Sequence, residues 1–241
     1  MNISVRKLST LCKKDIIDYF KNPALVVCSL LPILFVLLYK YIDFSIQEGD
    51  RNTAALMQGT LINSCMCALM IPSTMIAEEK EKFTLRTLML SNVNAMEFFW
   101  AKILVAGVIT IVGNVVVFMI SAESISYLPA YLLTSVFGNS CVVMLGADMG
   151  MACRDQASCS VLQIPVMLLF LLPVMLSGAA KFMLSLGKIT PYGAMLRLYH
   201  GLTAGSVGAE KMAVSAAVIL VWLIISSILF AYLYRVKGTD N

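Results

Sequence analysis

The chain of 241 residues has a net charge of +4, and 59% of its residues are hydrophobic while only 13% are charged. A soluble domain normally carries about 25% charged residues. In water, a fold of this composition would expose a large apolar surface, whereas the hydrocarbon core of a bilayer can solvate such a surface. The composition therefore excludes a soluble enzyme and indicates an integral membrane protein.

The cysteines point to neither disulfides nor a metal site. Their number is odd, and none falls in a segment that we expect outside the cell, so a disulfide framework is not predicted. Cys65 and Cys67 lie on one apolar helix with no His nearby, which favours packing over metal binding. We expect no bound metal.

Residues 1–22 have the pattern of an amphipathic helix lying on the membrane surface. Apolar residues recur at helical spacing and basic residues lie off that stripe: the stripe is Val5, Leu8, Cys12, Ile16 and Tyr19, and the basic residues are Arg6, Lys7, Lys13 and Lys14. The segment is too charged for a cleaved signal peptide, and Pro23 marks the break before the first span. An ordinary soluble helix is the alternative.

Six apolar runs follow, each near the ~20 residues needed to cross the hydrocarbon core. We place them at 23–42, 54–76, 98–121, 129–152, 161–178 and 212–233. The glycine-rich stretch 179–210 is too broken for a span, so we expect short re-entrant or exterior helices there. The predicted fold is an all-α polytopic membrane protein, 1–241, with an interfacial helix and six transmembrane helices.

The distribution of basic residues gives an orientation. With both termini in the cytosol, twelve of the 18 Lys and Arg residues fall in inside segments and six in outside segments. Because basic residues favour cytoplasmic loops, we expect a multi-pass protein of the bacterial cytoplasmic (inner) membrane with both termini cytosolic.

The largest polar block between the spans is 77–97, on the expected cytosolic side. It opens with five charged residues, Glu78, Glu79, Lys80, Glu81 and Lys82. A short helix then offers apolar anchors for a groove on a partner protein, with a threonine placed to cap it: the anchors are Leu85, Leu88 and Met89, and the cap is Thr84. We expect 77–97 to carry the function; a solvated loop without a partner is the alternative.

The same block resembles the cytosolic coupling loop of type-2 ABC exporter permeases. The family pattern is acid-basic-acid-x-Gly-Thr-Leu, two apolar residues, a Ser-Pro-like turn, an acid and a Gly-Lys. The matching residues here are Glu79, Glu81, Thr84, Leu85, Leu88, Ser91, Glu97 and Lys102. Phe83 stands where the family has Gly, and Asn92 where it has Pro; Asn is still a good turn residue.

A second stretch supports the resemblance, which covers the whole chain. Residues 171–178 are similar to the Pro-then-Leu-Ser-Gly segment at the end of the family's fifth span. Thr190, Pro191 and Arg197 are similar to the Asn-Pro and later Arg of its exterior helices. The resemblance implies a permease domain that works as a homodimer, or as a heterodimer, with separate ATPase chains.

The resemblance also implies the roles of particular residues. The ATPase-coupling residues would be Glu78, Glu79, Glu81, Thr84, Leu85, Leu88, Met89 and Glu97. There is no G-x-x-x-x-G-K-[ST] motif, so we expect ATP and Mg²⁺ on the partner ATPase, no cofactor and no catalytic residue on this chain, and no nucleic-acid partner. The long loop of ABC importers is absent, which favours export.

The sequence identifies the substrate less narrowly than it identifies the class of transporter. Related permeases move amphipathic peptides, drugs, lipid-linked glycans or ions, and a short permease without a large exterior domain fits an amphipathic peptide such as a bacteriocin best. Gln58 and Asn63 are pathway candidates because the second span borders the pathway in the family, although interhelical hydrogen bonding is the default for such residues. Asp148 is a third candidate; pairing with Arg154 or a neighbouring chain is the favoured interpretation.

Two other classes of function compete with the exporter. Glu78 and Glu79 are similar to the paired-Glu motif of prenyl-protein proteases, but those enzymes need His residues within spans, and His200, the only His, is not in one. A passive channel or membrane scaffold leaves the charged block 77–97 unexplained. Strict dependence of activity on a bound ATPase would separate these hypotheses.

Overall fold

The computed structural model describes residues 5–42, 51–82, 95–121, 124–176, 181–204 and 208–237, and within these ranges the regular structure is helical, with no strand. Six helical runs are long and apolar enough to cross a membrane: Pro23–Tyr41, Arg51–Glu81, Met96–Ser121, Ile125–Ala152, Gln156–Met175 and Ala209–Tyr234. Each overlaps one of the six predicted spans. The chain has the helices of a multi-pass membrane protein, as its composition predicted.

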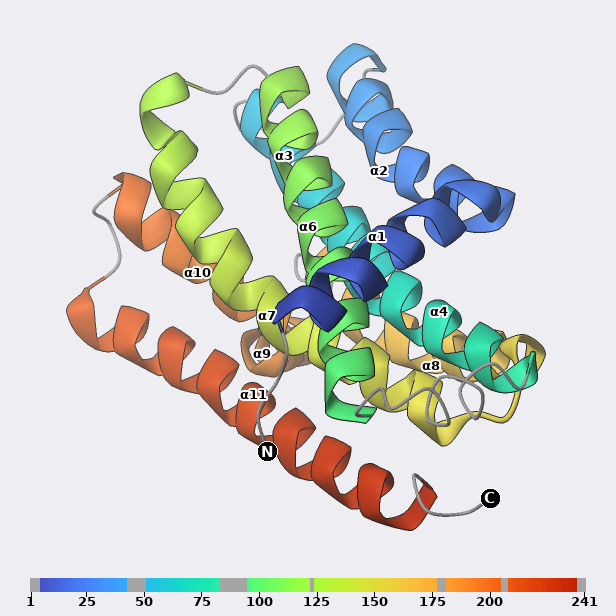
Figure 1. Cartoon of the computed structure of the whole chain (residues 1–241). Coiled ribbons are helices and arrows are strands. Elements are labelled where there is room, and N and C mark those ends of the chain that lie inside the picture. The colour runs from blue at the N-terminus through green and yellow to red at the C-terminus, as the bar shows by residue number, and fades with distance from the viewer. Residues whose placement is uncertain are drawn as a thin grey trace.

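The chain begins with two helices that meet at a corner. Helix α1 (Val5–Lys21) is followed at once by α2 (Pro23–Tyr41), and Asn22 caps α2 by accepting a hydrogen bond from the Ala24 backbone N–H at 3.2 Å. Pro23 suits the first helical position because it has no N–H to satisfy. Figure 1 shows α1 crossing over α6, against which it packs.

Helix α1 has a packed face and an exposed face. The buried residues are Leu11, Asp15 and Tyr19, spaced four apart, whereas Val5 and Ile16 of the predicted apolar stripe are exposed. A carboxylate, that of Asp15, therefore lies on the packed face.

The second span is the most buried of the six. It consists of α3 (Arg51–Asn63), a π-helical segment η1 (Ser64–Met70) and α4 (Ile71–Glu81), and 72% of its most apolar stretch is buried. Pro72 is the second residue of α4, just beyond the π-helical segment. It has no N–H to donate and its ring clashes with the preceding turn, which favours a local change of helical register. The helix continues to Glu81. Residues 77–81 are therefore helical, whereas we had predicted that the loop 77–97 begins there.

Helices α6 and α7 complete the centre of the bundle. Helix α6 (Ala95–Ser121) starts within the expected loop 77–97, and the 3₁₀ turn η2 (Ile125–Tyr127) leads into α7 (Leu128–Ala152). Helix α7 packs on α4, α6, α10 and α11. It approaches the second span closely, because a Cβ added at Gly146 would lie 2.3 Å from the Leu69 carbonyl oxygen.

The fifth span, α8 (Gln156–Met175), begins five residues earlier than predicted. Its N-terminus has a capping box, in which the Asp155 carboxylate accepts from the Ser158 backbone N–H at 2.7 Å while the Ser158 hydroxyl accepts from the Asp155 N–H at 3.3 Å. This reciprocal pair satisfies donors that the first turn would leave free.

Two short helices occupy the stretch where short helices were expected. Helix α9 (Lys181–Ile189) is mostly exposed, whereas α10 (Pro191–Ala204) buries Tyr192, Ala194 and Met195 among the other helices. The Trp222 indole N–H of the last helix, α11 (Ala209–Lys237), donates to the Ile189 carbonyl at 2.8 Å.

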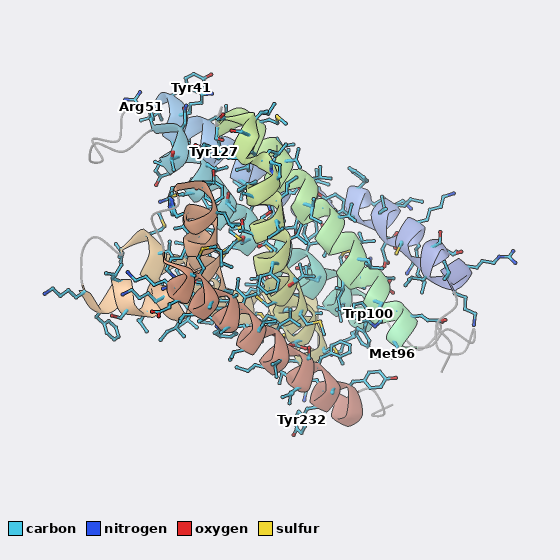
Figure 2. All side chains as sticks on the ribbon, turned by 90° about the vertical axis from the view of Figure 1, so that its left-hand side faces the viewer. Tyr41, Arg51, Met96, Trp100, Tyr127 and Tyr232 are labelled. Carbon is cyan, nitrogen blue, oxygen red and sulfur yellow. The ribbon has the colours of Figure 1, made fainter. Side chains whose placement is uncertain are left out.

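The bundle has two distinct ends. Figure 2 shows Tyr41, Arg51 and Tyr127 at one end and Met96, Trp100 and Tyr232 at the other. Aromatic residues of this kind concentrate at the level of lipid head groups, so the two groups mark the expected edges of the hydrocarbon core.

Candidate functional site

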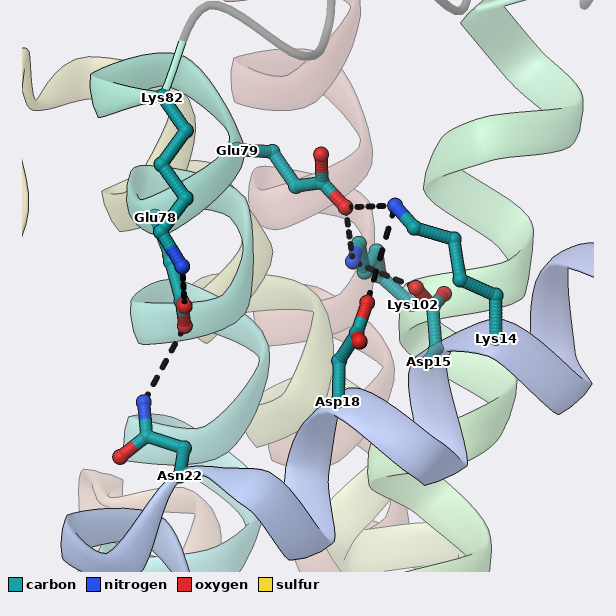
Figure 3. A network of polar contacts seen from close by, with 8 residues as sticks. All are labelled: Lys14, Asp15, Asp18, Asn22, Glu78, Glu79, Lys82 and Lys102. Carbon is teal, nitrogen blue, oxygen red and sulfur yellow. Dashed lines mark hydrogen bonds and ion pairs between the residues drawn. The ribbon is translucent and has the colours of Figure 1, made fainter.

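The charged end of α4 is joined to several other helices by polar contacts. Residues 78–82, which lie at the end of the second span, bind to four other helices. We call Glu78, Glu79, Lys80, Glu81, Lys82 and their partners Lys14, Asp15, Asn22 and Lys102 the α4-end network. Figure 3 shows most of its members.

The centre of the α4-end network is a buried ion-pair chain. Lys102 of α6 places its Nζ 2.6 Å from Asp15 Oδ1 of α1 and 3.2 Å from Glu79 Oε1 of α4. Lys14 of α1 reaches the same Glu79 oxygen at 2.5 Å. Three helices that are distant in sequence therefore share one set of charges, as the dashed contacts in Figure 3 show.

Burial makes these contacts obligatory. Lys102, Asp15 and Glu79 are only 1%, 2% and 6% exposed, and a buried charge without a partner is far more costly than a paired one. The Lys102 ammonium also lies 5.3 Å from the centre of the Phe98 ring, a cation–π distance.

The surroundings shift two pKa values on α1. Burial raises the pKa of Asp15, and the charge of Lys102 opposes part of that rise. Burial would lower the pKa of Lys14, but its hydrogen bond with Glu79 and the nearby carboxylates raise it overall. The Lys14 ammonium is thus held in its charged form.

Glu78 connects α4 to the corner between α1 and α2. Its Oε1 pairs with the Lys82 Nζ at 2.5 Å, and its Oε2 accepts from Asn22 Nδ2 at 3.2 Å. Asn22 also caps α2, so Glu78 holds the residue at which the chain turns from α1 into the first span.

Lys80 and Glu81 bind the ends of α7 and α8. The Lys80 Nζ donates to the Met151 carbonyl at 2.7 Å and to the Cys153 carbonyl, groups that the C-terminus of α7 leaves free. Glu81 Oε2 accepts from the Gln156 backbone N–H at 3.0 Å, at the N-terminus of α8. A cation thus meets the negative end of one helix and an anion the positive end of the next.

A cleft of about 350 Å³ lies beside the network, between α1, the start of α2 and α4. Its lining includes the buried Tyr19, Leu25 and Met75, together with Asp18, Lys21 and charged residues of the α4-end network. Asp15, Asp18 and Glu79 bring carboxylate oxygens close enough together for a metal ion. Two lysine ammonium groups already lie among these carboxylates, so the donor set suits an internal ion-pair chain better than a metal.

The predicted coupling residues divide into three groups. Glu78, Glu79 and Glu81 are brought together on the last turn of α4, but their charges bind other helices of the same chain. Glu97, on the first turn of α6, is 2% exposed and so does not face a docking surface. Thr84, Leu85, Leu88 and Met89 lie outside the described residues.

Sequence reasoning missed Lys14, Asp15 and Lys80. Asp15 had a usable signal, because it falls four residues from both Leu11 and Tyr19 and therefore on the packed face of α1. Nothing in the local sequence indicated that Lys80 would reach the end of α7, more than seventy residues later.

The three pathway candidates have different surroundings. Asn63 donates through Nδ2 to the Thr110 carbonyl at 2.9 Å and to Asn114 Oδ1 at 2.8 Å, which joins the second and third spans. The Gln58 side-chain oxygen is buried without a hydrogen-bond partner among the described residues.

Asp148 is 1% exposed, and neither of its carboxylate oxygens has a hydrogen-bond partner in the described part of the chain. The favoured pairing with Arg154 is therefore not made: Arg154 is exposed beyond the end of α7. Asp148 instead faces the packed interior of the bundle.

No family model matches the chain, and no characterised protein matches its sequence. Arguments about function therefore depend on the sequence motifs and on the geometry of the α4-end network.

Proposed function

We propose that this chain is the membrane subunit of an ATP-driven exporter of the type-2 ABC permease class. In this proposal, a separate ATPase binds ATP and Mg²⁺ and docks on the segment 83–94, and a second permease copy completes the translocation path. The cargo is a hydrophobic or amphipathic molecule, with an amphipathic peptide as the first candidate.

The observation that carries the proposal is the α4-end network. The docking segment leaves α4 directly after Lys82, and the five preceding residues bind α1, α6, α7 and α8. Because the central contacts are buried charge pairs, the helices resist separation at this point. A displacement of the docking segment is then passed to four helices together, which is what coupling to an ATPase requires.

The topology proposed for the chain follows from the same end of the bundle. Docking to a soluble ATPase places the Met96 and Trp100 end at the cytosolic face of the bacterial inner membrane, with both termini in the cytosol. Ile16, Ile17 and Phe20 of α1 are exposed there, which suits an interfacial helix with its apolar face in the bilayer.

Co-purification tests the proposal. The chain is co-expressed with tagged ABC ATPases of its source organism, as wild type and with Leu85→Asp and Leu88→Asp. We expect a stoichiometric complex with one ATPase that the double substitution abolishes. Phe44→Asp with Ile46→Asp, in the connection expected on the opposite side, is the control and should leave the complex intact. If the chain binds no ATPase, a channel or scaffold becomes the better explanation.

A further inference from the structure

The cleft of about 350 Å³ between α1, the start of α2 and α4 is lined by charged and apolar side chains together. We call it the α1–α2–α4 cleft. Its size is within the range of ligand pockets, about 300–1,000 Å³. Pro23, Leu25 and Met75 line it and belong to candidate membrane spans. The cleft therefore lies where the charged end of the bundle meets the hydrocarbon layer.

Most of the charged side chains that line the cleft already have partners within the chain. Lys14 and Lys102 both bind Glu79, at 2.5 and 3.2 Å, and Lys82 binds Glu78 at 2.5 Å. These charges hold helices of the bundle together, so they are not the groups that would select a ligand.

Two charged groups on α1 are the exceptions. Lys21 lines the cleft, is exposed, and forms no ion pair or side-chain hydrogen bond with any described residue. Asp18 is 3.8 Å from the Lys14 ammonium, which is beyond hydrogen-bond distance. Asp18 and Lys21 are three residues apart, which places them on the same side of α1. The cleft therefore offers one carboxylate and one ammonium group that are not used in the described part of the chain.

A neighbouring carboxylate and ammonium suit a zwitterionic ligand. The phosphate of a phosphoethanolamine group can accept from the Lys21 ammonium, and its own primary ammonium can donate to the Asp18 carboxylate. A phosphoglycerol group has only the phosphate and would meet Asp18 as a like charge. A phosphocholine group has a quaternary ammonium, which has no N–H to donate.

An exposed apolar stripe leads from the cleft along α2. Pro23, which lines the cleft, is followed at helical spacing by Val27, Leu30 and Leu34, so these residues share one face of the helix. The last three are 58%, 54% and 50% exposed. The stripe from Pro23 to Leu34 rises about 16 Å at 1.5 Å per residue, about half of the ~30 Å hydrocarbon core. An acyl chain attached to a head group in the cleft can lie on this stripe through one leaflet.

We propose that the α1–α2–α4 cleft binds the head group of phosphatidylethanolamine, with the phosphate on Lys21, the ammonium on Asp18 and one acyl chain along α2. The bound lipid would join α1 to the first span across the corner at Asn22. This proposal does not depend on the exporter function, because the lipid comes from the bilayer and no ATPase is needed to bind it.

Native mass spectrometry of the full chain in detergent tests the site. The purified chain is titrated with phosphatidylethanolamine, phosphatidylglycerol or phosphatidylcholine of identical acyl chains. We expect phosphatidylethanolamine to bind about fivefold more tightly than the other two, the scale of one exposed ion pair. Free phosphoethanolamine at the same concentration should not displace the lipid, because it lacks the chain that lies on α2. Equal binding of the three lipids, or displacement by the free head group, would overturn the proposal.

Two substitutions test the two charges separately. Asp18→Asn removes the carboxylate and keeps the shape of the side chain. The preference for phosphatidylethanolamine over phosphatidylglycerol should then disappear, because the like-charge repulsion ends and the phosphate contact remains. Lys21→Gln should weaken the binding of phosphatidylethanolamine about fivefold. Asp18→Ser replaces the first variant if it does not fold.

Lys13→Gln is the matched control. Lys13 is exposed on the same helix but does not line the cleft, so its loss should leave both the affinity and the lipid preference unchanged. A phosphatidylethanolamine preference that survives Asp18→Asn would refute the role of the carboxylate. A loss of binding in Lys13→Gln as large as that in Lys21→Gln would show general attraction of lipid to α1 and would refute the cleft as the site.

Discussion

Replacing Lys102 with methionine removes the charge at the centre of the α4-end network and keeps a side chain of similar length. The ammonium is 2.6 Å from Asp15 Oδ1 and 3.2 Å from Glu79 Oε1, and all three residues are buried. After the change, Glu79 still has the Lys14 ammonium at 2.5 Å. Asp15 keeps no comparable contact, because its other oxygen, Oδ2, has no hydrogen-bond partner among the described residues.

The expected cost follows from this single orphaned carboxylate. Removing one partner of a buried ion pair typically costs about 3–5 kcal/mol, and the lower end applies here because one of the two carboxylates remains paired. For a chain of this size, each kcal/mol shifts Tm by roughly 2–4 °C. Lys102→Met should therefore lower the apparent Tm by about 6–12 °C.

Thermal unfolding in detergent, followed by the fluorescence of Trp100 and Trp222, measures this shift. Lys82→Met is the matched control: its ammonium is 2.5 Å from Glu78, but its side chain is 62% exposed. An exposed pair is worth about 0–1 kcal/mol, so the control should shift Tm by less than about 4 °C. Adding Asp15→Leu to Lys102→Met should recover most of the loss. Equal shifts for Lys102→Met and Lys82→Met would refute the reasoning.

The loss of Tm in Lys102→Met should depend on pH. Burial raises the pKa of Asp15 above its ordinary value of 3.8, and loss of Lys102 raises it further. With a raised folded-state pKa, the native state binds more protons than the unfolded state, so stability falls as the pH rises through the interval between the two pKa values. The Tm deficit of Lys102→Met should be larger at pH 8 than at pH 5.

Three further changes test other parts of the structure by the same unfolding assay. Gly146→Ala puts a Cβ 2.3 Å from the Leu69 carbonyl oxygen and should cost roughly 1–3 kcal/mol, whereas Gly107→Ala should gain up to ~1 kcal/mol; similar effects at both glycines would contradict the packing. Asp148→Leu replaces a buried carboxylate without a hydrogen bond and should stabilise the chain by about 1–3 kcal/mol, so a lower Tm would show that Asp148 has a partner. The backbone hydrogen bond from Ser158 lowers the pKa of Asp155 below its ordinary value of 3.8. The wild type should therefore have a higher Tm than Asp155→Asn at a pH above 3.8, and this difference in Tm should disappear as the pH falls through the lowered pKa of the folded state. A difference in Tm that does not change with pH would contradict this prediction.

The membrane spans were predictable because their signal is local. A run of ~20 apolar residues predicts a crossing helix whatever it packs against, and Pro23 indicated the corner between α1 and α2. The helix ends were less predictable. Residues 78–81 are charged and were predicted as part of a loop, but they are helical because Glu79, Lys80 and Glu81 bind partners on other helices.

The candidate site could be predicted only in part for the same reason. The sequence motif selected Glu78, Glu79, Glu81 and Lys102, but it gave no indication that Asp15 would be the partner of Lys102, 87 residues away in the chain. Long-range pairing of buried charges depends on how the helices cross. The register of Leu11, Asp15 and Tyr19 on α1 was the only sequence signal, and it identifies a packed face without its partner.

The central proposal is that motion of a bound ATPase reaches α1, α6, α7 and α8 through the α4-end network. Hydrogen-exchange mass spectrometry on the purified complex in nanodiscs measures this most directly, by comparing the nucleotide-free state with the state trapped by ATP, Mg²⁺ and vanadate. We predict that exchange changes in α1 and around residues 153–158 together with the docking segment. Changes confined to 83–94, or no change with nucleotide at all, would contradict the proposal.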